Sequence, residues 1–150
     1  MIKKNIIIIS LIFFLTNCGF TPIYLKNTNI NFSIEHVNYT GDRELNNFLK
    51  TNLNQLSNKK NDNKIYIEAN SIYKKIILSK DGSGEVTNYQ LEAEVIFLIK
   101  PLNKKIKIIE KKIMDSMDDK FEEARYERTI KQNFASSIAN KLSSELIINQ

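Results

Sequence analysis

The sequence predicts an α+β domain: a four-stranded, mostly antiparallel sheet with two amphipathic helices on one face. Four segments alternate apolar and polar residues, and two others repeat apolar residues every three to four positions. Short turn-forming clusters separate the last three strand-like segments, which favours antiparallel hairpins. The expected order is strand, helix, strand, strand, strand, helix.

The chain begins with a pattern typical of an export signal. Lys3 and Lys4 precede an apolar run from Ile6 to Leu15, which only Ser10 interrupts. A membrane-spanning helix needs roughly 20 apolar residues. This run is about half that length, so residues 1–17 are predicted to be a signal peptide. The alternative is a buried first strand, but the two lysines flank the run on the side that a signal requires.

Cys18, the only cysteine, follows this run closely. The stretch Leu15-Thr16-Asn17-Cys18 resembles a bacterial lipoprotein box, with Asn17 where glycine, alanine or serine is usual. The resemblance implies that Cys18 becomes the first mature residue and carries acyl chains that hold the protein on a membrane. Gly19 in place of aspartate implies delivery to the outer membrane. A single cysteine excludes an intramolecular disulfide and a multi-cysteine metal site.

The mature chain has the length of one domain and is mildly basic. The precursor carries a formal net charge of +5, and the predicted signal removes two lysines. This balance does not favour nucleic acid as a partner. Residues 18–29 contain Pro22 and are predicted to be an extended, lipid-anchored tether. Residues 30–150 are predicted to form the single domain.

The first element of the domain is a strand with an irregularity. Alternation in Ile30–Ile34 predicts a half-buried strand, and Val37 and Tyr39 continue its apolar face out of phase. A bulge near Glu35 and His36 would account for the shift. His36 is interpreted as a strand-edge residue, because no nucleophile or acidic partner is recognisable near it.

A helix follows over about Asp42–Leu56. Asp42 is a good N-cap, because its carboxylate can accept a hydrogen bond from a backbone N–H of the first turn. The polar, asparagine-rich residues 57–63 predict a loop. The apolar residues on one helical face are Leu45, Phe48, Leu49, Leu53 and Leu56.

Three strands follow and share one apolar face. They are predicted at Lys64–Ser79, Val86–Lys100 and about Lys105–Met114, separated by turns at residues 80–84 and 101–104. A hairpin centred on Gly82 and the next tight turn predict a register. The expected cross-strand pairs are Ile65/Ile99, Ile67/Phe97, Ala69/Val95, Tyr73/Leu91, Ile106/Ile99 and Ile108/Phe97.

A long C-terminal helix is predicted over about Phe121–Ile147. The acidic stretch Asp115–Asp119 precedes it, where negative charge favours a helix start. Ala135 and Ala139 would let the helix lie close to the sheet. The larger apolar residues that step along its inner face are Ile130, Phe134, Ile138, Leu142 and Leu146.

The mature chain resembles the LPS-assembly lipoprotein family, LptE, over four stretches. Cys18–Tyr24 resembles the Cys-Gly-Phe-x-Pro-Leu-Tyr start of alphaproteobacterial members. The other three are the strand–helix unit Ile30–Leu56, the strand at Tyr89-Gln90-Leu91, and the terminal helix at Phe134–Leu142. The order and spacing of these stretches carry the resemblance, rather than any single motif.

The resemblance implies a non-catalytic protein of the outer membrane, anchored on its periplasmic side by lipidated Cys18. LptE proteins lie inside the LptD β-barrel, help it fold, plug it and assist placement of lipopolysaccharide in the outer leaflet. The expected partners are therefore LptD and lipopolysaccharide. Two other classes stay open: a lipoprotein adaptor of another envelope machine, such as an ABC-type transporter, and a small-molecule binding module with a lined pocket.

No catalytic constellation is recognisable. The chain has no glycine-rich phosphate loop, no His-Glu-x-x-His and no Gly-x-Ser-x-Gly. The acidic pairs Asp118-Asp119 and Glu122-Glu123 are interpreted as solvated charge at a helix start. No enzyme activity, cofactor or metal site is predicted.

Two sets of residues near the predicted turn at Gly82 are candidate contacts. Ile76, Ile77, Leu78 and Val86 put apolar side chains on both faces of a hairpin end, which favours packing against the barrel or its lipid; loops or the tether are the alternative cover. A second set, Lys74, Lys75 and Lys80, would suit lipopolysaccharide phosphates. Lysines at turns and edges also prevent edge-to-edge aggregation.

Overall fold

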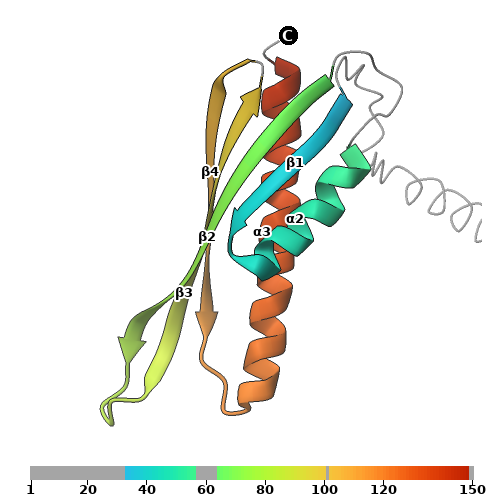
Figure 1. Ribbon diagram of the computed structural model, residues 1–150. Coiled ribbons are helices and arrows are strands. Elements are labelled where there is room, and N and C mark those ends of the chain that lie inside the picture. The colour runs from blue at the N-terminus through green and yellow to red at the C-terminus, as the bar shows by residue number, and fades with distance from the viewer. Residues whose placement is uncertain (1–32, 57–63, 101, 149–150) are drawn as a thin grey trace, which may run out of the picture.

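A computed structural model of the protein describes residues 33–56, 64–100 and 102–148. The predicted signal peptide, Cys18, the tether and residues 30–32 of the predicted first strand lie outside the described residues. The elements are β1 (Ser33–Gly41), α2 (Arg43–Leu56), β2 (Lys64–Lys80), β3 (Val86–Lys100), β4 (Lys104–Asp115) and α3 (Lys120–Ile148). Their order and class confirm the predicted α+β fold (Figure 1).

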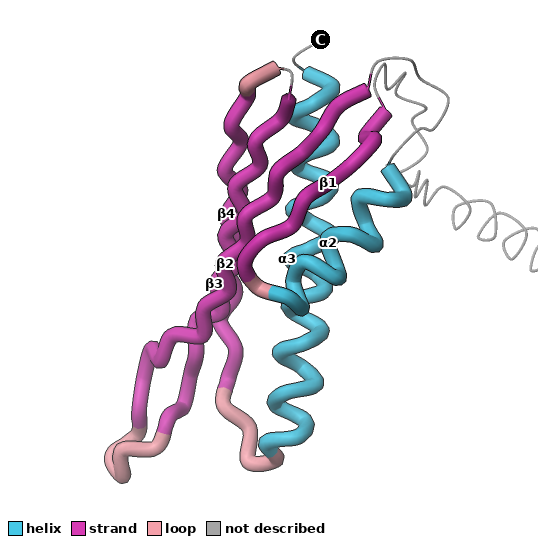
Figure 2. The backbone as a smooth tube through the Cα atoms, in the orientation of Figure 1, coloured by secondary structure: helices cyan, strands magenta, loops and turns pink. Residues whose placement is uncertain are grey.

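The strands form one sheet in the order β1-β2-β3-β4. β1 runs parallel to β2, and the other neighbouring pairs are antiparallel. α2 is the crossover connection that a parallel pair requires. Both helices lie on the same side of the sheet, and α3 runs along its length (Figures 1 and 2).

Local side-chain chemistry fixes the helix starts. The Leu45 N–H donates to Asp42 Oδ1 at 2.7 Å, which confirms Asp42 as the N-cap of α2. Asp119 Oδ1 accepts the Phe121 N–H at 2.8 Å and begins α3 in the same way. In β1 the register shifts between Ile34 and His36, which confirms the predicted bulge.

The predicted register is wrong by two residues in both hairpins. Ile67 pairs with Ile99 and Ala69 with Phe97, while Ile106 pairs with Phe97. In the first hairpin, Lys80 pairs with Val86, so the turn is centred on Ser83, one residue beyond the predicted Gly82. In the second, β4 begins at Lys104, directly opposite Ile99. A slip of two residues keeps every side chain on its predicted face, so the alternation alone does not detect it.

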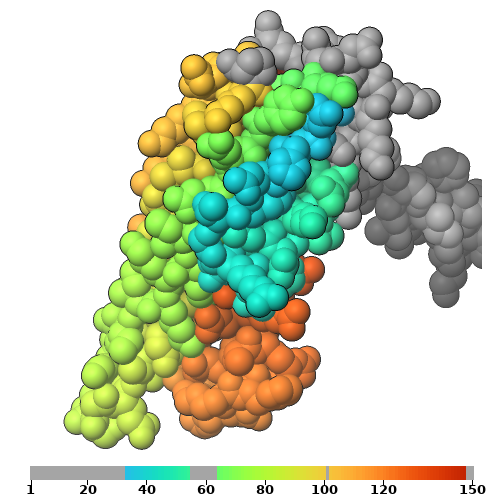
Figure 3. All heavy atoms as spheres, in the orientation of Figure 1, coloured from blue at the N-terminus to red at the C-terminus, as the bar shows by residue number. Residues whose placement is uncertain are grey.

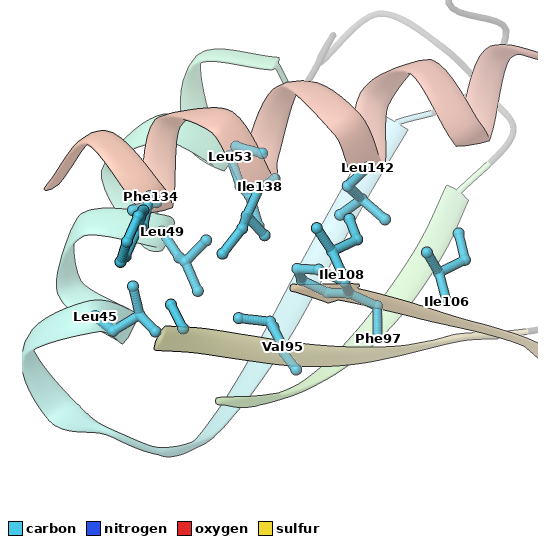
Figure 4. Packing of buried hydrophobic residues seen from close by; sticks show 14 of the residues in the cluster. Leu45, Leu49, Leu53, Val95, Phe97, Ile106, Ile108, Phe134, Ile138 and Leu142 are labelled. Atoms are coloured by element: carbon cyan, nitrogen blue, oxygen red, sulfur yellow. The ribbon is translucent and has the colours of Figure 1, made fainter. Parts of the chain in front are cut away.

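The core lies between the sheet and the two helices. All inward side chains of β3 from Leu91 to Ile99 are fully buried, at 0% exposure. Figure 4 shows Val95 and Phe97 of β3 and Ile108 of β4 facing the apolar residues of the helices. The helix residues that close this core are Leu45, Leu49, Leu53, Ile130, Phe134, Ala135, Ile138, Ala139, Leu142 and Leu146.

Gly41 connects β1 to α2 at a point where no side chain fits. Its φ is +96°, and a Cβ there would overlap the backbone carbonyl oxygen of Ser71. The Asp42 N–H also donates to this oxygen, at 3.1 Å. The chain thus turns closely over β2 before the helix begins.

We expect Gly41→Ala to lower the free energy of unfolding by about 2–5 kcal/mol, because it adds backbone strain and a steric overlap. Gly82→Ala is the control: its Cβ would meet no atom within 4 Å. That variant should change stability by less than about 0.5 kcal/mol. Chemical denaturation measures both, and equal midpoints would contradict the role given to Gly41.

Candidate docking surface

The β2–β3 hairpin extends well past its neighbours. β1 ends at Gly41, which pairs with Ser71, and α2 starts two residues later. We call the part of the hairpin beyond this point, residues 72–94, the distal hairpin. β4 runs beside the distal hairpin as far as Asp115, which lies opposite Asn88. The end of the distal hairpin projects from the body beside the start of α3 (Figure 3).

The four apolar residues singled out in the sequence lie together at the end of the distal hairpin. We call Ile76, Ile77, Leu78 and Val86 the apolar tip. Ile76, Ile77 and Leu78 are 41%, 52% and 47% exposed, and Val86 is half-buried. Ile76 pairs with Gln90 and Ile77 with Tyr89, so the two isoleucines point to opposite faces of the sheet.

The outer face of the sheet, turned away from the helices, carries further exposed isoleucines that the sequence reasoning missed. Ile72, Ile109 and Ile113 are all exposed on this face. Ile113 lies opposite Gln90, which in turn lies opposite Ile76, so Gln90 separates Ile113 from the apolar tip on this face. The sequence does indicate this position, because Ile109 and Ile113 alternate out of phase with the core residues of β4 and must therefore face the other side of the sheet.

Charges on the outer face are paired across the strands. Lys111 Nζ lies 2.7 Å from Glu92, and Lys107 Nζ lies 2.9 Å from Glu94. A hydrogen bond from Lys111 holds the pKa of Glu92 below its ordinary value. The glutamates are more buried than the lysines, so lysine stems and isoleucines dominate this surface.

The three candidate lysines do not form one cluster. Lys74 is exposed on the outer face, opposite Glu92, and Lys80 is exposed at the end of β2. Lys75 points to the helix side, where its Nζ lies 2.9 Å from carboxylate oxygens of both Glu123 and Glu127. Lys75 therefore already has two counter-ions within the molecule.

Glu123 is the most heavily engaged acidic group in this region. Its side chain accepts hydrogen bonds from the Met117 N–H at 3.0 Å, Lys120 Nζ at 3.0 Å and Lys75 Nζ at 2.9 Å. Burial alone would raise the pKa of Glu123, but these bonds outweigh it and lower the pKa to about 2. One residue of the predicted solvated pair Glu122-Glu123 is therefore buried: Glu123 is only 5% exposed.

Neither a membrane-spanning helix nor a metal cluster emerges from the described residues. No helix among them is long and apolar enough to cross a membrane. Within the same ranges, no group of three or more histidine, cysteine, aspartate and glutamate side chains could hold a metal ion.

Solved lipoproteins share this fold. The chain superposes on the rare lipoprotein B of Shewanella oneidensis with a TM-score of 0.54 at 14% identity, covering 77% of this chain and 99% of that one. For lipoprotein B of Nitrosomonas europaea the TM-score is 0.52 at 18% identity, with 76% and 83% covered. A minor lipoprotein of Acinetobacter baumannii gives 0.50 at 12% identity, with 73% and 93% covered. At these identities the likeness establishes the fold.

Sequence comparison adds no relative. No protein-family model and no curated protein sequence matches the chain.

Glu123→Gln should remove a pH-dependent part of the stability. Because the folded-state pKa is lowered from 4.5 to about 2, Glu123 stabilises the fold above pH 4.5, and this contribution is lost as the pH falls toward 2. We expect the variant to be less stable by about 1–2 kcal/mol at pH 6, a value reduced for solvent screening. Urea denaturation between pH 6 and pH 2.5 should show the difference shrinking.

Glu122→Gln is the matched control, since it makes the same charge change at an exposed neighbour that pairs with Arg125. Its effect should stay within about 0.5 kcal/mol. If the stability difference between Glu123→Gln and the wild type did not change with pH, the lowered pKa of Glu123 could not be its cause.

Proposed function

We propose that this protein is an outer-membrane lipoprotein of the LptE type, which plugs the LptD β-barrel, assists its folding and helps insert lipopolysaccharide into the outer leaflet. The shared fold carries the proposal, because it extends over 99% of the chain of the Shewanella lipoprotein and does not rest on one motif. The lipoprotein-box stretch that ends at Cys18 is a second, separate support. In this proposal Cys18 carries the acyl chains, and no reaction is catalysed.

The apolar tip and the outer-face isoleucines are the proposed contact with the barrel. Exposed aliphatic side chains gathered in one region of a molecule are typical of interaction sites. Burying one such side chain fully contributes about 1.5–3 kcal/mol. The paired charges around them reduce the cost of covering the surface, since each glutamate already has a lysine beside it.

Lipopolysaccharide is the second proposed partner. Lys74 and Lys80 are the candidates for its phosphates, because both are exposed near the apolar tip. Lys75 is a weaker candidate than the sequence suggested, because a phosphate would have to displace Glu123 and Glu127 from its ammonium group.

Replacing Ile77 and Leu78 together with serine should lower recovery of a large outer-membrane β-barrel about tenfold or more, because the variant loses apolar contact area. The measurement is a tagged pull-down from detergent-solubilised outer membranes. Leu102→Ser is the matched control: Leu102 is also an exposed leucine, but it lies in the turn between β3 and β4, at the other end of the sheet (Figure 1). Circular dichroism should show that both variants remain folded.

The outcomes of this pull-down separate the open functions. If the double variant recovers as much barrel as the wild type, the apolar tip is not the contact with the barrel. Another part of the chain would then be expected to cover the tip. Recovery of an inner-membrane transporter in place of a barrel would favour the adaptor function. Cys18→Ala, run alongside, tests whether the anchor or the domain holds the complex together.

Reversing Lys74 and Lys80 to glutamate should weaken lipopolysaccharide binding about fivefold or more at low salt. The difference should shrink as salt is raised, because exposed charges are screened over about 10 Å at 0.1 M. Binding of fluorescent lipopolysaccharide to the purified protein measures both effects. Lys141→Glu reverses one charge on α3, as each single variant Lys74→Glu and Lys80→Glu does on β2, and it should bind as the wild type does. An unaffected Lys74 and Lys80 double variant would argue against the phosphate role.

A further inference from the structure

The distal hairpin is held to the body in a different way from the rest of the sheet. On the helix side it faces the first half of α3, through contacts of Tyr73 and Lys75 with the helix. Glu123, Glu127 and Lys131 lie at intervals of four on the inward side of this half of α3, and the apolar core begins beside them at Ile130. In the second half, the corresponding inward side chains are apolar and belong to the core. Leu91 and Ala93 of the distal hairpin still belong to the apolar core. Beyond them, the hydrogen bonds and ion pairs of Tyr73 and Lys75 connect the hairpin to this half of α3.

Lys75 lies at the centre of this contact. Its Nζ is 2.9 Å from Glu123 Oε1 and 2.9 Å from Glu127 Oε2. The ammonium group also lies 4.1 Å from the ring centroid of Tyr89, on the neighbouring strand. One side chain of β2 thus joins β3 and two successive turns of α3.

Both glutamates are themselves fixed by other groups. The second oxygen of Glu123 accepts the Met117 N–H at 3.0 Å, in the connection between β4 and α3. The Ser116 N–H next to it donates to the Thr87 carbonyl of β3 at 2.8 Å. Tyr73 Oη donates to the first oxygen of Glu127 at 2.9 Å. These bonds hold the carboxylates in place for Lys75.

We propose that Lys75 is a positioning residue, which holds the distal hairpin, and with it the apolar tip, in a fixed place against α3. Its charge is essential to this role. Without the ammonium group, two partly buried carboxylates face the hairpin with no shared counter-ion, and the contact loses its ionic attraction. The significance of the apolar tip rests on the proposed function, but the positioning itself is a property of the isolated protein.

The neighbouring lysine provides a matched control. Lys74 and Lys75 are adjacent in β2, and both pair with residues of β3. Lys74 points to the outer face, away from α3. Lys74→Gln and Lys75→Gln therefore remove the same charge from the same strand, on opposite sides of the sheet.

The test is amide hydrogen exchange, followed by mass spectrometry, on the full chain in detergent. In Lys75→Gln, exchange should rise about tenfold or more in the peptides covering 72–80, 86–92 and 120–128, because this region opens locally. It should stay unchanged in the core peptides covering 65–69 and 134–146. Lys74→Gln should match the wild type throughout, and Lys75→Arg should restore most of the protection, because it keeps the charge.

Three results would overturn the proposal. One is a Lys75→Gln profile equal to that of Lys74→Gln, which would mean that strand pairing alone holds the distal hairpin. Another is a uniform rise of amide exchange over the whole domain in Lys75→Gln, which would mean that Lys75 stabilises the fold in general and does not position the hairpin. The last is a Lys75→Arg profile equal to that of Lys75→Gln, which would exclude the charge as the cause. No partner is needed for this readout, so it can fail or succeed independently of the barrel pull-down.

Discussion

The inward side chains of β3, from Leu91 to Ile99, are all fully buried, and the other elements are arranged to cover them. β2 and β4 protect the two long sides of the strand through backbone pairing. α2 and α3 cover its face with leucine, isoleucine, phenylalanine and alanine. Because one face of the sheet is closed in this way, the opposite face is left to solvent or to a partner.

Most of this arrangement could be predicted from the sequence, because it depends on local patterns. The spacing of the apolar residues predicts each helix and strand. Asp42 predicts a helix start, because its carboxylate caps the first turn. The bulge beside His36 showed itself as a change of phase. The register could not be obtained in the same way, since a slip of two residues leaves the pattern intact. The register depends on where the turn lies, and the first turn is centred on Ser83 rather than on Gly82.

The candidate docking surface was only partly predictable, for a related reason. Ile76, Ile77 and Leu78 are consecutive, so at least one had to face away from the core; all three are exposed, on a part of β2 that β1 does not reach. The role of Lys75 required the tertiary structure. A lysine that faces only solvent and one that pairs with carboxylates look alike in sequence, and the carboxylates that distinguish Lys75 lie about 50 positions away, on α3.

α3 therefore has two functions in the molecule, divided near Ile130. Its second half completes the apolar core, and its first half is joined to the distal hairpin by ion pairs and hydrogen bonds. Apolar packing is insensitive to the direction of approach, whereas charged hydrogen bonds fix geometry. The division gives the core its stability and the distal hairpin a defined position.

The placement of the main core-covering helix at the C-terminal end also determines the order in which the domain can be completed. A ribosome releases the four strands and α2 before it releases Ile138, Leu142 and Leu146. Until those residues emerge, the apolar face of β3 has only α2 to cover it, and a nascent chain in this state exposes a surface prone to aggregation. The domain therefore closes its core only when α3 joins the strands that precede it.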